Sequence, residues 1–166
     1  YLEEGKSVLI IANNVKTSQD LFEQISYAGS KCLLHSGFNK RDRNRIEKSI
    51  TNEDPAKRPQ LLIATQAVEV SLDIDYDIAF IENAPIDALI QRFGRVNRAG
   101  KKGIAPIFLF EEIIGNTPFY DDSVLNRTWE EMTRLEGREL SENDLVQACN
   151  EVYKEGYNKN QNNPKE

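Results

Sequence analysis

Short runs of consecutive apolar residues alternate along the chain with longer segments whose apolar residues recur every three or four positions. Runs of the first kind, bounded by polar residues, are typical of strands that are buried on both faces. The pattern predicts five such strands, at residues 7–12, 31–35, 60–65, 77–82 and 104–110. Because helical segments separate them, we expect an α/β fold with a mainly parallel sheet between helices.

The helical segments carry recognisable start and stop signals. Thr17 or Ser18 can cap a helix that ends at Gly29, and Asn39 can cap a second helix through residues 41–50. Residues 66–76 are too short for a full helix and too polar for a buried strand, so we expect an irregular connection there.

The last third of the chain has a different character. Residues 121–135 and 141–153 predict two helices, the second with Ser141 and Asp144 spaced as a capping box. Residues 158–166 have the polar composition of a disordered end.

Charge divides the chain in a similar place. Residues 1–110 carry 15 Lys and Arg against 14 Asp and Glu, whereas residues 111–166 carry 6 against 13. The net charge of -6 therefore belongs to the tail, and the first part can present basic patches to phosphate. We predict one domain over 1–112 and a helical tail over 113–166.

Composition narrows the class of protein. With 39% hydrophobic and 29% charged residues, the 166-residue chain is typical of a soluble globular protein. Its apolar runs are too short to span a membrane, and no signal peptide opens it. Cys32 and Cys149 match no metal-ligand spacing, so we expect no metal site and thiols in a reducing cytoplasm.

One stretch concentrates positive charge. Residues 91–102 contain five cations and no acid. Pro85 can open a helix that runs to about Arg98 and stops at Gly100.

On such a helix, Gln91, Arg95 and Arg98 would share one face, opposite a face of apolar residues that packs on the sheet. An exposed basic helix face is one interpretation. A phosphate-binding face is the other, because guanidiniums present forked donors and keep their charge. The ligand would then lie beyond the carboxyl ends of the strands.

Four segments resemble motifs of superfamily 2 helicases, in the order and spacing of that family. "QRFGRVNR" (91–98) resembles motif VI, "ATQAVEVSLDID" (64–75) motif V and "LIIANNVKTSQDLFEQI" (9–25) motif IV, and "LLHSGFNKRDRNRIE" (33–47) matches the segment between them. The set belongs to the second RecA-like domain, a three-layer fold. Within the superfamily, the residues of these motifs most resemble those of the CRISPR-associated helicase-nuclease of type I interference systems.

The resemblance implies roles for individual residues. Arg95 and Arg98 match the arginines that reach the γ-phosphate of ATP, and Gln91 the glutamine near that phosphate and the attacking water. Asp73 matches the acid that contacts the ribose. Thr65 matches the threonine that touches the nucleic-acid backbone with its hydroxyl and amide.

Further polar residues follow strand ends. Asn13, Asn14, His35 and Ser36 can line a DNA track, or they can serve turns and helix caps. The family implies as partners a first RecA-like domain of the same protein, single-stranded DNA and the CRISPR surveillance complex, and no membrane.

The resemblance covers half of a helicase motor. "GKS" at residues 5–7 precedes a strand, whereas the phosphate loop follows one, so we interpret it as a coincidence. ATP and its Mg²⁺ would therefore be held by the first RecA-like domain, and a single histidine cannot build the family's HD nuclease site.

Two alternatives stay open. The residues of motif V have a counterpart in RNA helicases of the DEAH-box kind, so the chain can also be a domain of such an enzyme. A lone RecA-like domain can also bind nucleic acid or protein without catalysis, for which the acidic tail suits a protein partner better than DNA.

Overall fold

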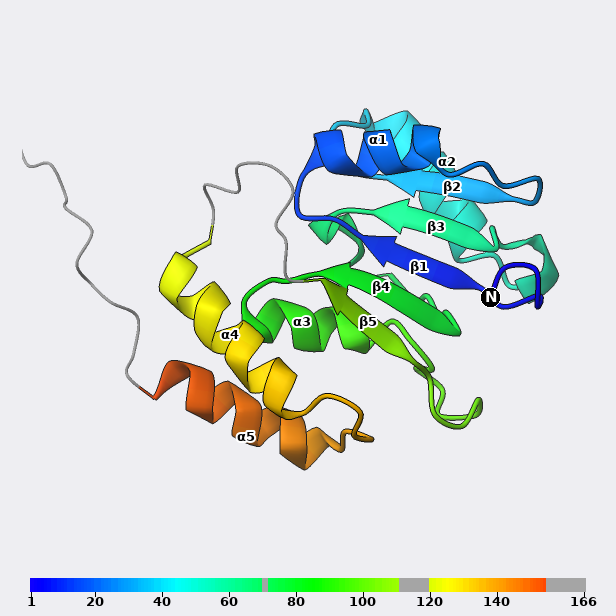
Figure 1. Cartoon of the computed structure of the whole chain (residues 1–166). Coiled ribbons are helices and arrows are strands. Elements are labelled where there is room, and N and C mark those ends of the chain that lie inside the picture. The colour runs from blue at the N-terminus through cyan, green and yellow to red at the C-terminus, as the bar shows by residue number, and fades with distance from the viewer. Residues whose placement is uncertain (70–71, 111–119, 155–166) are drawn as a thin grey trace, which may run out of the picture.

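A computed structural model of the chain describes residues 1–69, 72–110 and 120–154. Their strands form one parallel sheet in the order β2-β3-β1-β4-β5, which confirms the predicted α/β class (Figure 1). The strands are β1 (Val8–Ile11), β2 (Lys31–Leu34), β3 (Leu61–Ala64), β4 (Ile78–Glu82) and β5 (Ile107–Phe110). All five predicted strands are present, each one to three residues shorter than expected.

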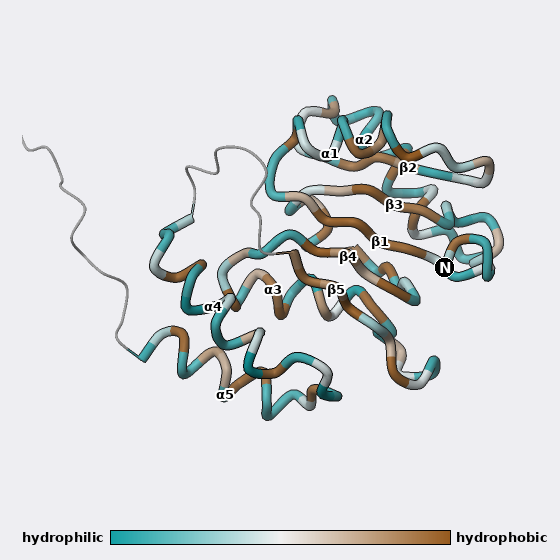
Figure 2. The backbone as a smooth tube through the Cα atoms, viewed as in Figure 1, coloured by the Kyte–Doolittle hydropathy of each residue, from teal (hydrophilic) through white to brown (hydrophobic). Residues whose placement is uncertain are grey.

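The strands form where the sequence can bury both sides of the backbone. Along β1, Leu9 and Ile11 face one core cluster, whereas Val8 and Ile10 face another. Apolar residues follow the central strands in Figure 2. Burial on both faces is the condition under which all-parallel sheets occur.

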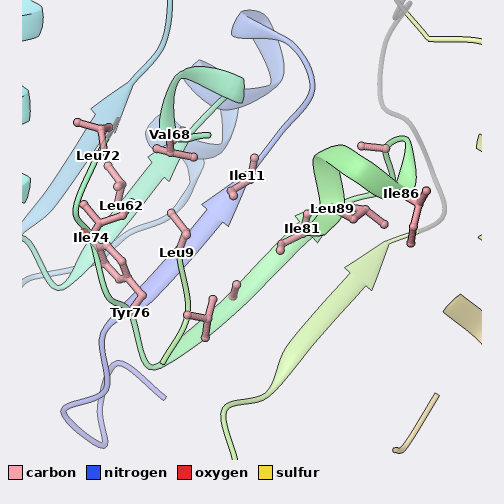
Figure 3. Close-up of a cluster of buried hydrophobic side chains, with 14 of the residues drawn as sticks. Leu9, Ile11, Leu62, Val68, Leu72, Ile74, Tyr76, Ile81, Ile86 and Leu89 are labelled. Carbon is pink, nitrogen blue, oxygen red and sulfur yellow. The ribbon is translucent and has the colours of Figure 1, made fainter. Parts of the chain in front are cut away.

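Helices cover the two faces unequally. On one face Leu21 and Phe22 of α1 (Val15–Gln24), with its C-cap Ile25, pack against β1 and β3. On the other, α2 and α3 join the larger core, which Figure 3 shows around Leu9, Leu62 and Leu89. The helices are α1 (Val15–Gln24), α2 (Lys40–Ile50), α3 (Ile86–Phe93), α4 (Asp122–Arg134) and α5 (Glu142–Tyr153), with short 3-10 turns at Pro55–Lys57 and Gln66–Val68.

The first helix differs from its prediction at both ends. Asn14, rather than Thr17 or Ser18, is the cap, and its side chain accepts a hydrogen bond from the backbone N–H of Thr17 at 2.8 Å. The helix ends at Gln24, five residues before Gly29. The predicted cap of α2 at Asn39 is confirmed.

The third helix is much shorter than predicted. It ends at Phe93 with Gly94 as its C-cap, instead of continuing to Arg98. Val96 forms an isolated parallel bridge with Tyr76, and this pairing draws the chain out of helical geometry. Arg95 and Arg98 therefore lie beyond the helix, and the shared helical face predicted for Gln91, Arg95 and Arg98 is wrong.

Both tail helices are confirmed, and α5 packs on both α3 and α4. Val124 and Val152 belong to the same core cluster as the sheet, and the capping box of Ser141 and Asp144 is formed. The predicted domain boundary falls in 111–119 and the predicted disordered end in 155–166, both outside the described residues. No helix of the described part is long and apolar enough to cross a membrane.

A carboxylate ties the starts of β1 and β4 together. One oxygen of Asp77 accepts hydrogen bonds from the backbone N–H and the hydroxyl of Ser7, both at 2.8 Å, and Lys102 pairs with the other oxygen at 2.9 Å. Ser7 thus has a structural role, and "GKS" lies before a strand, as the sequence indicated. Burial alone would raise the pKa of Asp77, but these hydrogen bonds outweigh it and lower the pKa.

We predict that Asp77→Asn destabilises the fold at pH 7 by about 1–2 kcal/mol, because it weakens charge-assisted hydrogen bonds. Since the pKa of Asp77 is lower in the folded chain, its contribution is present above its unfolded value of about 3.9 and is lost as the pH falls through the folded value. Urea unfolding should show that the variant loses less stability between pH 7 and pH 3 than the unmodified chain does. The exposed Glu53→Gln is the control, and an unchanged pH dependence in Asp77→Asn would contradict the assignment.

Candidate functional site

The predicted nucleic-acid residues meet at one edge of the sheet, because parallel strands end on the same side. Asn13 follows β1, His35 and Ser36 follow β2, and Thr65 follows β3 directly. Glu82 is the last residue of β4, the strand next to β1. We call these five residues the strand-end cluster.

Asn13 lies inside this cluster rather than on its surface. It is 3% exposed, its side-chain amide donates to the carbonyl of Asn83 at 2.7 Å, and its backbone N–H donates to the carboxylate of Glu82 at 2.6 Å. Its side-chain oxygen accepts from Arg92. The expectation that Asn13 lines a DNA track is therefore wrong, because its polar groups brace β1 against β4.

Arg92 is a buried cation beside the strand-end cluster, with 0% exposure. Its guanidinium donates to Glu69 at 2.9 Å, to the side chain of Asn13 at 3.0 Å and to the carbonyl of Glu82 at 3.1 Å. The hydroxyl of Tyr120 lies 3.4 Å from its third nitrogen. Arg92 is thus paired locally rather than turned to solvent.

Thr65 was predicted to contact nucleic acid through its hydroxyl and its backbone amide, but the amide is bonded within the sheet. Its backbone N–H donates to the carbonyl of Leu34 at 3.1 Å, within the sheet edge. The residue is 3% exposed and precedes the 3-10 turn Gln66–Val68 without a side-chain capping bond. The amide is thus committed to the sheet, which leaves the hydroxyl as the remaining group of the two.

His35 and Ser36 differ in exposure. His35 is buried, its ring stacks on Phe38 at 4.3 Å, and its Nδ1 accepts the backbone N–H of Gly37 at 3.0 Å. Burial lowers the pKa of His35, which favours a neutral ring with its proton on Nε2. Ser36 is exposed, so it is the member of this pair that is open to solvent.

The predicted phosphate residues form a second group, at the other end of α3. Residues 94–100 lie beside Tyr76, whose backbone N–H donates to the carbonyl of Arg95 at 3.0 Å and whose carbonyl accepts from Asn97 at 2.9 Å. Tyr76 precedes β4, so this segment lies near the amino end of that strand. The expectation that a phosphate bound by these residues lies beyond the carboxyl ends of the strands is therefore wrong. We call residues 94–100 the arginine turn.

Arg95 is held inward by the loop after β3. Its guanidinium donates to the carbonyl of Leu72 at 2.7 Å and to that of Glu69 at 2.6 Å. It is 7% exposed, and its buried Nε has no acceptor among the described residues. Burial, together with the positive charge of Arg98, lowers the pKa of Arg95. The Nε–H of Arg95 is therefore an unused donor close to a second cation, Arg98.

Arg98 is the accessible member of the turn. Its side chain is 48% exposed and pairs with Asp73 at 3.4 Å, a contact that solvent screens. Its backbone N–H donates to Asp75 at 2.9 Å, which fixes where the side chain begins. Gln91 is exposed on the last turn of α3. Asp73 is 89% exposed, so Arg98, Gln91 and Asp73 are all accessible from solvent.

The backbone of the turn is set by Asn97, which has a φ of 46°. Asparagine tolerates this left-handed conformation better than most residues. Its side-chain oxygen accepts the backbone N–H of Lys102 at 3.0 Å, and its carbonyl accepts that of Gly100 at 2.8 Å. The turn is thereby a defined loop, which is how Arg98 is presented without a helix.

Some contributing residues gave no signal in the sequence interpretation. Glu69, Glu82 and Tyr120 complete the surroundings of Arg92, and Gln66 donates to the carbonyl of Asn13 at 2.9 Å. An acid at the end of an apolar strand is a signal that could have identified Glu82, because a buried carboxylate needs a donor. No group of three or more His, Cys, Asp or Glu within the described ranges could hold a metal ion.

Several known proteins are similar to this chain over most of its length. "CRISPR-associated helicase Cas3" of Thermoproteus tenax is 33% identical over 158 residues, which cover 93% of this chain and 27% of the relative. "CRISPR-associated nuclease/helicase Cas3" of Streptococcus thermophilus is 39% identical over 145 residues, covering 76% and 16%. The chain thus spans about a quarter or less of these relatives.

The crystal structure of T. fusca Cas3 with AMPPNP superposes with a TM-score of 0.77 at 28% identity, covering 90% of this chain and 20% of that one. The family model described as "CRISPR-associated nuclease/helicase Cas3, C-terminal" matches residues 4–101, more than half of the chain. The chain therefore belongs to the Cas3 nuclease/helicase family and is a RecA-like domain of its C-terminal part.

Proposed function

We propose that this chain is the second motor domain of an ATP-dependent DNA helicase that unwinds target DNA for degradation in CRISPR interference. The observation that carries the proposal is the connection of the strand-end cluster to the arginine turn by a single loop. Glu69, near the start of this loop, bonds both Arg92 and Arg95, and Asp73 and Asp75 bond Arg98. Family membership supports a helicase, and the loop supplies a route between two ligands.

The arginine turn is the side that would meet ATP held by the first RecA-like domain of the same protein, with Mg²⁺ bound there. The half-exposed guanidinium of Arg98 and the unused Nε of Arg95 suit anionic phosphate oxygens. ATP hydrolysis would supply the free energy for movement. Gln91 would lie near the terminal phosphate, and Asp73 would accept from the ribose if its pair with Arg98 opens.

The strand-end cluster is the side that would meet single-stranded DNA. Ser36 and the hydroxyl of Thr65 would contact the nucleic-acid backbone, and the buried His35, whose Nε2 lies 3.4 Å from the side chain of Gln19, would support Ser36 beside it. Asn13 supports them from below. In the assembled system we propose the CRISPR surveillance complex as the partner that delivers the opened DNA.

Replacing Arg98 with alanine, in the protein that carries both RecA-like domains, should reduce ATP hydrolysis and unwinding about 10³-fold or more, the range measured for arginine fingers. Arg98 lies at the arginine turn and away from the strand-end cluster, so DNA affinity should not change. The matched control is Arg134→Ala, which removes an arginine of α4 whose side chain is 59% exposed, against 48% for Arg98. Normal unwinding by the Arg98 variant would reject the finger assignment.

The 166-residue chain alone should hydrolyse ATP no faster than the buffer background, since its arginines need a phosphate gripped by another domain. Phosphate release is measured with and without single-stranded DNA, and then after adding the separately purified first domain. We expect turnover to appear once the first domain is added. DNA-stimulated turnover by the chain alone would contradict the proposal.

The complete protein should unwind a DNA duplex with a single-stranded overhang and leave the matching RNA duplex intact. The reverse preference would favour the DEAH-box alternative. Binding measured over a range of salt concentrations tests the non-catalytic alternative, because affinity carried by phosphate contacts falls steeply with salt. A salt-independent interaction of this chain would point to a protein-binding module instead.

A further inference from the structure

Four aromatic rings form a continuous exposed surface on the sheet. Phe80 of β4 stacks on Phe108 of β5 at 4.9 Å and lies 6.1 Å from Phe110, and Tyr1 lies 5.9 Å from Phe108 and 6.4 Å from Phe80. Tyr1, Phe108 and Phe110 are 48%, 38% and 52% exposed. We call these four residues the aromatic face.

The aromatic face is the uncovered part of an otherwise covered layer. It lies on the same side of the sheet as α1, whose apolar residues pack over Val8, Leu61 and Ile63 of β1 and β3. The opposite side of β5 is in the main core, through Ile107 and Leu109. Parallel strands are rarely left open on one face, so the layer that α1 begins is incomplete over β4 and β5.

The first residues of the chain have the hydrogen bonds of a helix end. The backbone N–H of Lys6 donates to the carbonyl of Tyr1 and that of Gly5 to the carbonyl of Leu2, both at 3.1 Å. Gly5 has a φ of 78°. A six-to-one bond enclosing a five-to-two bond, closed by a left-handed glycine, is the Schellman motif that ends α-helices. Residues 1–4 therefore have the conformation of a last helical turn.

This last turn is seated on the aromatic face itself. Tyr1 contacts the rings of β4 and β5, and the neighbouring Leu2 packs toward the cluster beneath α1. A helix is about 10 Å wide, and two strands span about the same distance. The uncovered strip over β4 and β5 therefore has room for one helix beside α1.

From these observations we propose that the aromatic face is the docking site of an amphipathic helix whose C-terminal turn is residues 1–4. This helix belongs to the polypeptide that leads into Tyr1 in the intact protein, and it completes the α1 layer. Since Tyr1 and Leu2 face the sheet, apolar residues are required three, four and seven positions before Tyr1. The family has room for such a segment, because this chain spans 27% and 16% of the two relatives above.

The charges beside the aromatic face favour a helix over nucleic acid. Platforms that stack bases combine their rings with cations that contact phosphates. Here Glu3 and Glu4 follow Tyr1 and Leu2 directly, which would repel a phosphate backbone. On a helix, the same two acids lie on the solvent side while Tyr1 and Leu2 face inward.

The experiment compares this chain with a version extended upstream by about twenty codons of its own gene. Both carry Cys32→Ser and Cys149→Ser, and a single new thiol is placed at Phe108→Cys or, as the control on α5, at Val146→Cys. We expect maleimide to label Phe108→Cys at least about tenfold more slowly in the extended protein, because labelling then requires local opening. Val146→Cys should label equally fast in both.

A second comparison stays within the extended protein, so it does not depend on how well the shorter chain folds. Aspartate at the positions three and four before Tyr1 should restore fast labelling of Phe108→Cys. Equal labelling with and without the extension would overturn the proposal. So would protection that rises with protein concentration, which would assign the face to a second copy, or protection that requires an oligothymidine. None of these readouts depends on ATP hydrolysis.

Discussion

The buried guanidinium of Arg92 is the interaction on which the rest of the site depends. Removing such a charge from water costs several kcal/mol, and the cost is offset only where every donor is matched. Here four hydrogen bonds offset much of that cost, accepted by the carboxylate of Glu69, the side-chain oxygen of Asn13, the carbonyl of Glu82 and the hydroxyl of Tyr120. The first three partners come from separate segments, so the ends of β1 and β4 and the loop after β3 are fixed relative to α3 by one residue.

That fixed loop gives the two proposed ligand sites a common support. Glu69 holds Arg92 with its carboxylate and Arg95 with its backbone carbonyl. A shift of Glu69 would therefore disturb both arginines at once. Coupling between sites requires an element that both can bias, and on the proposed function Glu69 and Leu72, in the loop after β3, would be part of that element.

The sequence was sufficient for the strands and insufficient for the end of α3. Apolar runs define strands locally, and all five formed where predicted. The helix ends early because Val96 pairs with Tyr76, a contact twenty positions away that no periodicity reveals. The burial of Asn13 has the same origin, since its partners Glu82 and Arg92 are distant in sequence. Residue types at strand ends were thus predictable, whereas which of them face solvent depended on tertiary contacts.

The two arginines of the turn would not respond equally to a phosphate. Arg98 would exchange an exposed pair with Asp73, and such pairs are worth about 0–1 kcal/mol. Arg95 could offer its unused Nε at once, but its two terminal nitrogens would have to give up the carbonyls of Leu72 and Glu69, at a cost of about 1–3 kcal/mol for each acceptor left without a donor. On the proposed function, Arg98 therefore engages first. Full engagement of Arg95 requires the loop carrying Glu69 and Leu72 to move, and this requirement would link nucleotide binding to the strand-end cluster.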